Sequence, residues 1–297
     1  MKDYLRYLWY WICKYPLSLL PNNIFFNIQY NIVCLRHGYK HHWLNINNPR
    51  RFNEKIHWLK LHPCVKEGEL LADKYRVREY IKHTIGEKYL IPLIGVWDKV
   101  DEIELAKLPN KFVLKANHGS GMNIICKDKS KIDWNKAKNK MRFWLKNSQY
   151  CLSREWQYKD TPRKIICEQF LKYDITDYKF FCFNGRPKYI QVDIDRFKCH
   201  RRSFFTDKWE SAPFTTLYEQ PEKMPEKPTQ LEEMLGVATK LAKDYAAPQG
   251  SRGLWQPGEC CVQSGRVWRN LAINNAYGPH EVSSGWEDLG PVSEVQA

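Results

Sequence analysis

Apolar residues recur at helical spacing in four stretches of the chain, and this period predicts four helices. They span residues 52–61, 71–82, 134–146 and 231–245. Asp73 is the expected N-cap of the second helix. Residues 1–50 predict shorter helices that are broken at Pro16, Pro21 and Gly38.

Compact apolar runs between turn residues predict strands. They cover residues 90–98, 111–115, 122–126, 164–170, 178–183, 188–192 and 203–205. A small-residue loop joins 111–115 to 122–126, and Asn184-Gly185 joins 178–183 to 188–192, so both pairs are expected to be hairpins. We expect 90–98 to be buried and 203–205 to lie at a sheet edge. Helices and hairpins together predict an α+β fold.

The pattern changes abruptly after Tyr245. No lysine follows Lys243, Ile273 is the only isoleucine of this tail, and neither the strand period nor the helix period persists. The chain therefore divides into a helical segment at 1–50, an α+β region at 51–245 and an atypical tail at 246–297. An out-of-frame tail, a junction to foreign sequence or a disordered segment each accounts for the change.

Composition narrows the class of protein. With 297 residues, of which 43% are hydrophobic, the chain can build one large domain or two or three packed lobes. The net charge of +14 favours an anionic partner such as nucleic acid, a phosphorylated ligand, an acidic polysaccharide or a membrane surface. The ten cysteines show neither CxxC nor zinc-finger spacing, which is typical of reduced thiols in the cytoplasm.

The first fifteen residues are aromatic and basic. The uncharged run Tyr7–Cys13 is too short to span a bilayer. A peripheral membrane contact at the inner face would set three aromatic residues at headgroup depth and turn three basic residues to lipid phosphates. These are Trp9, Tyr10 and Trp11, and Lys2, Arg6 and Lys14. The alternative is an ordinary helix that the same aromatic residues pack on the core.

The loop of the first predicted hairpin carries the clearest candidate chemistry. Lys115 ends an apolar strand, and Gly119, Ser120 and Gly121 follow. Glycines let backbone N–H groups approach an anion, and serine adds a hydroxyl donor, so the segment suits a phosphate chain. It is neither a Walker A loop nor a Rossmann turn. An ordinary glycine hairpin with a solvated lysine is the alternative.

Other charged positions have a functional and a plain interpretation. Lys74 either adds a second cation for the phosphates or lies on a solvated helix face. Glu168 ends a strand, where it suits ribose and base amino groups, or a salt bridge. Lys179 lies among aromatic residues of a hairpin. Asp193 and Asp195, with Arg196 beside them, would lie on one strand face and suit a substrate or a metal, or form a surface charge pair.

Taken in order, eight segments resemble the TupA-like (teichuronopeptide biosynthesis) branch of the ATP-grasp enzymes. They include LADKYRVREYIK, LPNKFVLKANHGSGMNIICKDKS, ICEQFL and DYKFFCFNGRPKYIQVDIDRF, and the matching region covers roughly residues 35–245. The resemblance implies an ATP-grasp fold in which two α+β lobes hold ATP between them, after a helical N-terminal segment.

The resemblance also implies roles for residues. Lys74 and Lys115 would contact the nucleotide phosphates, and Gly119, Ser120 and Gly121 would close over them. The hinge strand, which meets adenine and ribose, would comprise Glu168, Gln169, Phe170 and Leu171. Lys179 and Arg196 are the catalytic candidates, and Asp193 and Asp195 the substrate-binding ones. The implied cofactors are ATP and Mg²⁺.

The implied activity is carboxylate–amine ligation through an acyl phosphate, in surface polysaccharide biosynthesis, with an acidic or uronic-acid glycan as substrate. In the family, two strands of the form RVDLY and GRVYFGELT supply carboxylates that hold Mg²⁺. Here Arg269-Asn270 stands where the second acid is expected and no RVD occurs, so we expect impaired catalysis and identify no metal ligands. A glycosyltransferase, suggested by the DxD at Asp193–Asp195, and a non-catalytic nucleotide- or glycan-binding remnant are the alternatives. No nucleic-acid module is recognisable.

Overall fold

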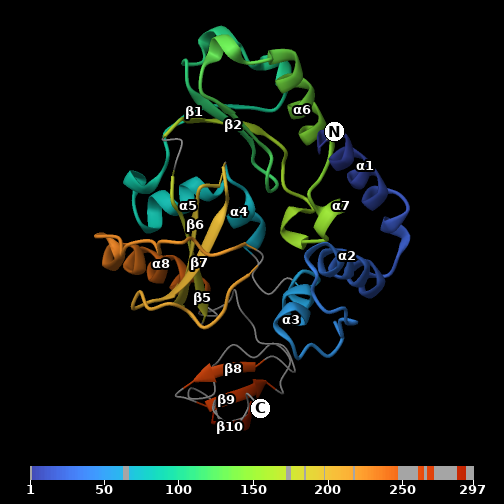
Figure 1. Ribbon diagram of the computed structural model, residues 1–297, viewed down its shortest axis with the longest axis vertical. Helices are drawn as coiled ribbons and strands as arrows, with labels where there is room; N and C mark the ends of the chain where they lie inside the picture. The colour runs from blue at the N-terminus through green and yellow to red at the C-terminus, as the bar shows by residue number, and fades with distance from the viewer. Residues whose placement is uncertain are drawn as a thin grey trace. The chain divides into compact units, whose positions relative to one another are not determined.

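The computed structural model describes residues 2–62, 67–171, 175–183, 185–196, 198–216, 218–246, 260–263, 266–270 and 286–291, with side chains from Tyr7 to Ala242 within these ranges (Figure 1). The chain divides into two compact units, Met1–Tyr173 and Asp174–Ala297. Helices and antiparallel sheets are both present, so the α+β prediction is confirmed. Among the described residues, no helix has the length and apolar character needed to cross a membrane.

The first unit begins with a helical region. It consists of α1 (Lys2–Lys14), a 3₁₀ turn at Leu17–Leu19, α2 (Asn22–His37) and α3 (Phe52–Leu59). As predicted, prolines and a glycine separate these helices: Pro21 precedes α2, and Gly38 ends it at φ 69° with its N–H bonded to the Cys34 carbonyl O. The buried core of this region contains Cys13, Phe25, Phe26, Leu44 and Ile46.

The aromatic residues of α1 divide between its two faces. Tyr10 is only 4% exposed and Trp9 packs against the core, so these two residues follow the alternative of an ordinary packed helix and do not lie at headgroup depth. Trp11 is 56% exposed. Lys14 Nζ donates to Asn147 Oδ1 at 3.4 Å. The side chains of Lys2 and Arg6 lie outside the described residues.

The helix expected over 71–82 is two short helices, α4 (Gly68–Ala72) and α5 (Val77–Thr84). The continuous helix is wrong because Asp73 Oδ1 accepts from the N–H groups of Tyr75 and Arg76, at 2.8 and 3.2 Å. An aspartate that binds the backbone just ahead of it favours a turn over a continuing helix. Lys74 therefore lies in a turn.

A four-stranded antiparallel sheet forms the other half of the first unit. Its strands are β1 (Leu93–Trp97), β2 (Phe112–Ala116), β3 (Asn123–Cys126) and β4 (Ile165–Gln169), in the order β1-β4-β2-β3. The predicted β2–β3 hairpin is confirmed. The expectation that β1 is buried is wrong: it lies at the sheet edge and is half-buried, with Ile94 exposed.

The helix α6 (Trp134–Lys146) has the predicted bounds and packs Met141 and Trp144 into the same core as Phe112, Leu114 and Cys167. The short helix α7 (Tyr150–Ser153) follows it. Five 3₁₀ turns complete the described connections of this unit, at Glu87–Tyr89, Val100–Glu102, Leu105–Lys107, Lys129–Lys131 and Trp156–Tyr158.

The second unit contains the antiparallel sheet β5-β6-β7, formed by β5 (Asp177–Phe183), β6 (Arg186–Ile194) and β7 (Arg201–Thr206). The hairpin predicted around Asn184-Gly185 is confirmed, with Gly185 at φ 72°, while Asn184 lies outside the described residues. β7 is the predicted edge strand. The helix α8 (Leu231–Ala246) buries Leu231 against Ile190, Val192 and Phe205.

The described residues of the atypical tail form three short strands. They are β8 (Cys260–Gln263), β9 (Arg266–Asn270) and β10 (Trp286–Pro291), which pair antiparallel in the order β10-β9-β8. The alternation of apolar and polar residues in these strands is too short to predict them.

Candidate nucleotide site

Lys115 and Glu168 face each other across two paired strands. On β2, Phe112, Leu114 and Ala116 enter the core, so the alternation of the strand turns Lys115 to the other face. β4 pairs with β2 and brings Glu168 opposite Val113, two positions from Lys115. Lys115 Nζ donates to Glu168 Oε2. The Glu168 carboxylate is buried, so its charge is balanced inside the protein.

Arg78 balances the second oxygen of the same carboxylate. Its Nη1 lies 3.5 Å from Glu168 Oε1, and its Nη2 donates to the Ile91 carbonyl O at 2.7 Å. Arg78 is part of the matching segment LADKYRVREYIK but was not predicted to be a site residue. Helix α5 and strand β4 are far apart in sequence, so only the folded chain brings this pair together.

Lys74 reaches the glycine loop from the turn between α4 and α5. Its backbone N–H donates to the Asn117 carbonyl O at 3.1 Å, and its Nζ donates to the Gly119 carbonyl O. Burial, followed by repulsion from Lys115, lowers the pKa of Lys74, while Asp73 and Glu168 oppose the shift. The two ammonium groups therefore repel each other, and an anion bound beside them would weaken that repulsion.

Asn117 fixes the strand end to that turn. Its Nδ2 donates to Asp73 Oδ1 at 2.9 Å and to the Pro162 carbonyl O at 2.7 Å, while its Oδ1 accepts from the N–H of Lys164 at 2.8 Å. The side chain is fully buried. Asn117 was not predicted as a positioning residue, although its place between Lys115 and the glycines was a usable signal.

The loop between β2 and β3 rests on α6. His118 is fully buried, and its Nε2 lies 3.0 Å from the Trp144 carbonyl O. Burial lowers the pKa of His118, which favours the neutral ring. A Cβ on Gly119 would meet Met122 Sδ at 3.0 Å, so this position has no room for a side chain without movement. Gly121 adopts φ 66°, and both it and Ser120 are exposed.

Of the predicted hinge strand, only Glu168 and Gln169 belong to β4. Phe170 and Leu171 follow the strand end, and Leu171 is exposed. The boundary between the two compact units falls just after them, at Tyr173. The first unit thus brings together Lys74, Lys115, Gly119 and Glu168 of the residues predicted to bind the nucleotide.

The second unit holds a separate charged cluster on the face of β5-β6-β7 opposite its apolar core. Asp193 is 1% exposed, and its Oδ2 accepts from Lys179 Nζ and Gln191 Nε2, both at 2.8 Å. Its Oδ1 accepts from Arg202 Nε at 2.7 Å and lies 3.0 Å from His200 Nε2. Burial opposes ionisation, but these hydrogen bonds outweigh it and hold the pKa of Asp193 below its usual value.

Lys179 bridges two carboxylates, because its Nζ also lies 2.7 Å from Asp177 Oδ2. Arg196 pairs with the same Asp177 oxygen. The prediction that Asp193 and Asp195 share a strand face is wrong. β6 ends at Ile194, and Asp195 is an exposed turn residue at φ 49°, so the alternation stops before it.

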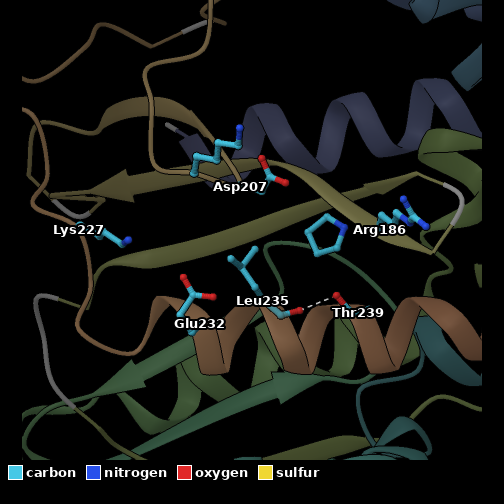
Figure 2. A pocket seen from close by; sticks show the side chains of 8 residues that line it. Arg186, Asp207, Lys227, Glu232, Leu235 and Thr239 are labelled. Carbon is cyan, nitrogen blue, oxygen red and sulfur yellow. Dashed lines mark hydrogen bonds between the residues drawn. The ribbon is translucent and has the colours of Figure 1, made fainter.

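A hollow of about 640 Å³ lies between α8 and the turn ends of the second sheet (Figure 2). Its lining includes the basic Arg186, Lys208 and Lys227, and the acidic Asp207 and Glu232. Of the neutral residues, Thr239 donates its hydroxyl to the Leu235 carbonyl O at 2.8 Å and so serves the helix itself. None of the residues predicted to be functional lines this hollow.

The chain has the features of an ATP-grasp protein: an α+β fold, a strand that carries a lysine, a glycine loop, and a buried glutamate on the strand that pairs with it in the sheet. A family model described as TupA-like ATPgrasp matches residues 54–249, about two thirds of the chain. The chain therefore belongs to the TupA-like ATP-grasp family. No curated protein and no solved structure matches it. Proteins of the ATP-grasp family generally bind ATP and Mg²⁺.

The described residues fit the two ligands unequally. Two ammonium groups and a close-packed glycine loop suit ATP phosphates. For Mg²⁺, the described residues contain no group of three or more His, Cys, Asp or Glu side chains placed to hold a metal. The buried carboxylates of Glu168 and Asp193 are already bound by cationic side chains. The described part of the chain therefore does not provide the oxygen-rich site that Mg²⁺ requires.

Proposed function

We propose that Lys74, Lys115 and the Gly119–Gly121 loop bind the phosphates of ATP. The observation that carries the proposal is the bond from Lys74 Nζ to the Gly119 carbonyl O, with Lys115 on the strand that leads into the same glycine loop, in a chain of the TupA-like ATP-grasp family. Charge-assisted hydrogen bonds from the lysines would neutralise the phosphates. Glu168 and the residues up to Leu171 would meet the ribose and adenine.

We further propose a carboxylate–amine ligase-like role in bacterial surface polysaccharide biosynthesis, of the capsular or teichuronopeptide type. In such a reaction a carboxylate oxygen bonds to the γ-phosphorus and ADP leaves; an amine then displaces phosphate at the acyl carbon and loses a proton. Lys74 and Lys115 would stabilise the transferred phosphoryl group, and the closed loop would exclude water. The net charge of +14 suits an acidic or uronic-acid glycan.

Lys179 and Arg196 are proposed to hold the anionic reactant. Each is tied to an aspartate but remains partly exposed, with 43% and 44% of the side chain accessible. Asp193 would act by positioning Lys179 rather than by touching the substrate. Asp195 has no neighbouring cation among the interactions described, and its role in substrate binding remains a prediction.

A cytoplasmic location agrees with this proposal. The cysteines described with side chains are all unpaired, as expected in a reducing compartment that also supplies ATP. Peripheral contact of residues 1–15 with the inner face of the membrane is part of the same proposal.

A nucleotide-binding remnant without catalysis is the second candidate. It is favoured by the poor fit of the described residues to Mg²⁺ and by Arg269-Asn270 at the expected metal strand. The glycosyltransferase alternative has lost its supporting feature, because Asp193 is enclosed by cationic groups and Asp195 lies in a turn.

Calorimetric titration with ATP tests the binding proposal. Lys115→Met keeps the aliphatic stem but removes the charge, and we expect affinity to fall about tenfold, the value of one charge-assisted contact. Lys111→Met removes an exposed lysine just before the same strand and should change affinity less than about twofold. Equal affinity in all three proteins would contradict the proposed site.

Phosphate release separates the two candidate functions. The assay combines the protein with ATP, Mg²⁺, an amine and a uronic-acid polymer. Release that requires the polymer and fails in Lys115→Met supports the ligase. ATP binding without release supports the remnant. Thermal stabilisation by UDP-sugars but not by ATP would favour a glycosyltransferase.

A further inference from the structure

We propose that the N-terminal helices dock this protein on the surface of an anionic lipid bilayer. The proposal goes beyond the nucleotide function and does not rest on it. It starts from α1, whose inner face packs Tyr7 and Tyr10 against Phe143 of α6, with ring centroids 4.3 and 5.4 Å apart. The opposite face is therefore turned away from the core.

That outer face is apolar. Leu8, Trp11 and Tyr15 are exposed and fall within about 60° of the helix circumference, because each residue turns the helix by roughly 100°. Leu19, 86% exposed, extends the apolar surface into the following 3₁₀ turn. A soluble helix normally presents polar residues on such a face.

The second helix and the segment after it also carry large exposed apolar side chains. These are Ile32, Val33, Leu35, Tyr39 and Trp43. Together with Leu8, Trp11, Tyr15 and Leu19 they form what we call the N-terminal apolar set. Tryptophan and tyrosine favour the depth of lipid headgroups, where the ring is apolar and its edge meets water.

After Asp3, near the start of α1, the charged residues along this part of the sequence are all basic up to Glu54. The whole chain contains 33 acidic residues in 297, one in nine, yet the fifty residues from Tyr4 to Asn53 contain none. Six lysines and arginines lie in the same stretch. The next acid, Glu54, is buried and accepts three backbone N–H bonds, from Asn45, Arg50 and Arg51, so it does not offset them at the surface.

The helix against which α1 packs is basic as well. α6 carries Lys136, Lys138, Lys140, Arg142 and Lys146 among its thirteen residues, and no acid. α1 and α6 lie side by side in the first unit (Figure 1). Asp101 pairs with Lys138 and Arg142, so part of this charge is balanced. An exposed apolar face on a helix that packs beside a basic helix is the pattern of segments that lie in the interface of anionic membranes.

Two other binding partners would match this surface less well than a bilayer. Nucleic acid would use the cations and rings but would leave the exposed aliphatic side chains of Leu8, Leu19 and Leu35 unused. A second copy of the chain would bring two basic surfaces together, and like charges oppose that contact. A bilayer surface satisfies both the aliphatic and the cationic groups.

Co-sedimentation with vesicles tests the proposal on the full-length protein. We expect binding to vesicles of phosphatidylcholine with phosphatidylglycerol, little binding to phosphatidylcholine alone, and release by high salt. Trp11→Ser, Tyr15→Ser and Leu19→Ser combined should weaken binding about tenfold or more. Ile94→Ser, Ile175→Ser and Phe183→Ser remove exposed apolar groups elsewhere and should leave binding unchanged.

A charge-reversal pair separates lipid docking from general stickiness. Arg36→Glu with Lys40→Glu should weaken vesicle binding about tenfold or more, while Lys131→Glu with Lys223→Glu makes the same change in net charge at exposed sites and should not. Circular dichroism and ATP titration check that each variant is folded. Equal vesicle binding by all variants would overturn the proposal. So would tighter binding to RNA than to vesicles, or self-association that only the N-terminal variants abolish.

Discussion

At the scale of single residues, the Asp193 side chain is both buried and ionised. Arg202, Lys179 and Gln191 donate to a carboxylate that is almost inaccessible to water. We predict that Asp193→Asn lowers the free energy of unfolding by about 3 kcal/mol at neutral pH, because it leaves clustered cations without their counter-charge. Urea denaturation monitored by tryptophan fluorescence measures the loss. Asp195→Asn, at an exposed turn, should change stability by less than about 0.5 kcal/mol.

The same pair of variants has a defined pH dependence. The pKa of folded Asp193 lies below the value of about 4 for an unfolded chain. Its stabilising contribution is therefore complete above pH of about 4 and is lost as the pH falls through the folded pKa. The stability difference between the wild type and Asp193→Asn should shrink as the pH falls below 4. A difference that stays constant over this range would contradict the ionised state of Asp193.

Glu54 supports a second prediction at this scale. Its carboxylate accepts backbone N–H bonds from Asn45, Arg50 and Arg51, at 3.0, 2.9 and 2.9 Å. These bonds, above all the one from Arg51, lower the pKa of Glu54 to about 2. We predict that Glu54→Gln lowers the free energy of unfolding by about 2 kcal/mol at pH 7, the cost of weakened bonds to a charged group. This deficit should vanish between about pH 4 and pH 2, since protonation makes the two side chains alike. Chemical denaturation across that range, with the exposed Glu67→Gln as control, measures it.

Site residues could be predicted from the sequence where a local segment identified them. Lys74, Lys115, Gly119 and Glu168 were identified from local segments, and the first unit brings them together. Arg78 was missed because its partner lies on a strand ninety positions further along the chain. Long-range pairing of this kind depends on sheet order, which local patterns do not contain.

At the scale of elements, two glycines predict opposite effects of the same substitution. Gly121 holds the turn of the β2–β3 hairpin at φ 66°, so Gly121→Ala should destabilise the protein by about 1 kcal/mol. Gly236 lies inside α8, and a Cβ at this position would meet nothing within 4 Å, so Gly236→Ala should stabilise the protein by about 0.5–1 kcal/mol. Thermal unfolding of both variants measures the signs. A stabilising Gly121→Ala would show that the turn is not constrained.

The elements themselves were largely predictable, and the exceptions have physical reasons. The helix at 134–146 and both hairpins follow directly from period and turn signals. The break at Asp73 was missed because an N-cap and a turn use the same side-chain bonds, and only the local geometry separates them. The edge position of β1 was missed because Leu93–Trp97 is as apolar as a central strand.

At the scale of the whole molecule, the family region ends where the composition changes. The family match stops at residue 249, a few positions beyond the last residue of α8, Ala246. The candidate phosphate contacts lie wholly in the first unit, and the core of the second unit is formed by β5, β6, β7 and α8. These observations agree with the hypothesis that the tail is foreign to the family fold, which resequencing of the coding DNA tests directly.

We therefore predict that a chain ending at Gln249 keeps both its fold and its nucleotide affinity. Its melting temperature should stay within about 2 °C of the full-length value, a shift worth less than about 1 kcal/mol in a protein of this size. Its ATP affinity should change less than about twofold, because Lys74 and Lys115 keep all the partners described for them. Scanning calorimetry and ATP titration of the two chains, with Lys115→Met in both, measure these quantities. If truncation abolished ATP binding while leaving the melting temperature unchanged, the tail would be part of the site and the foreign-tail hypothesis would be wrong.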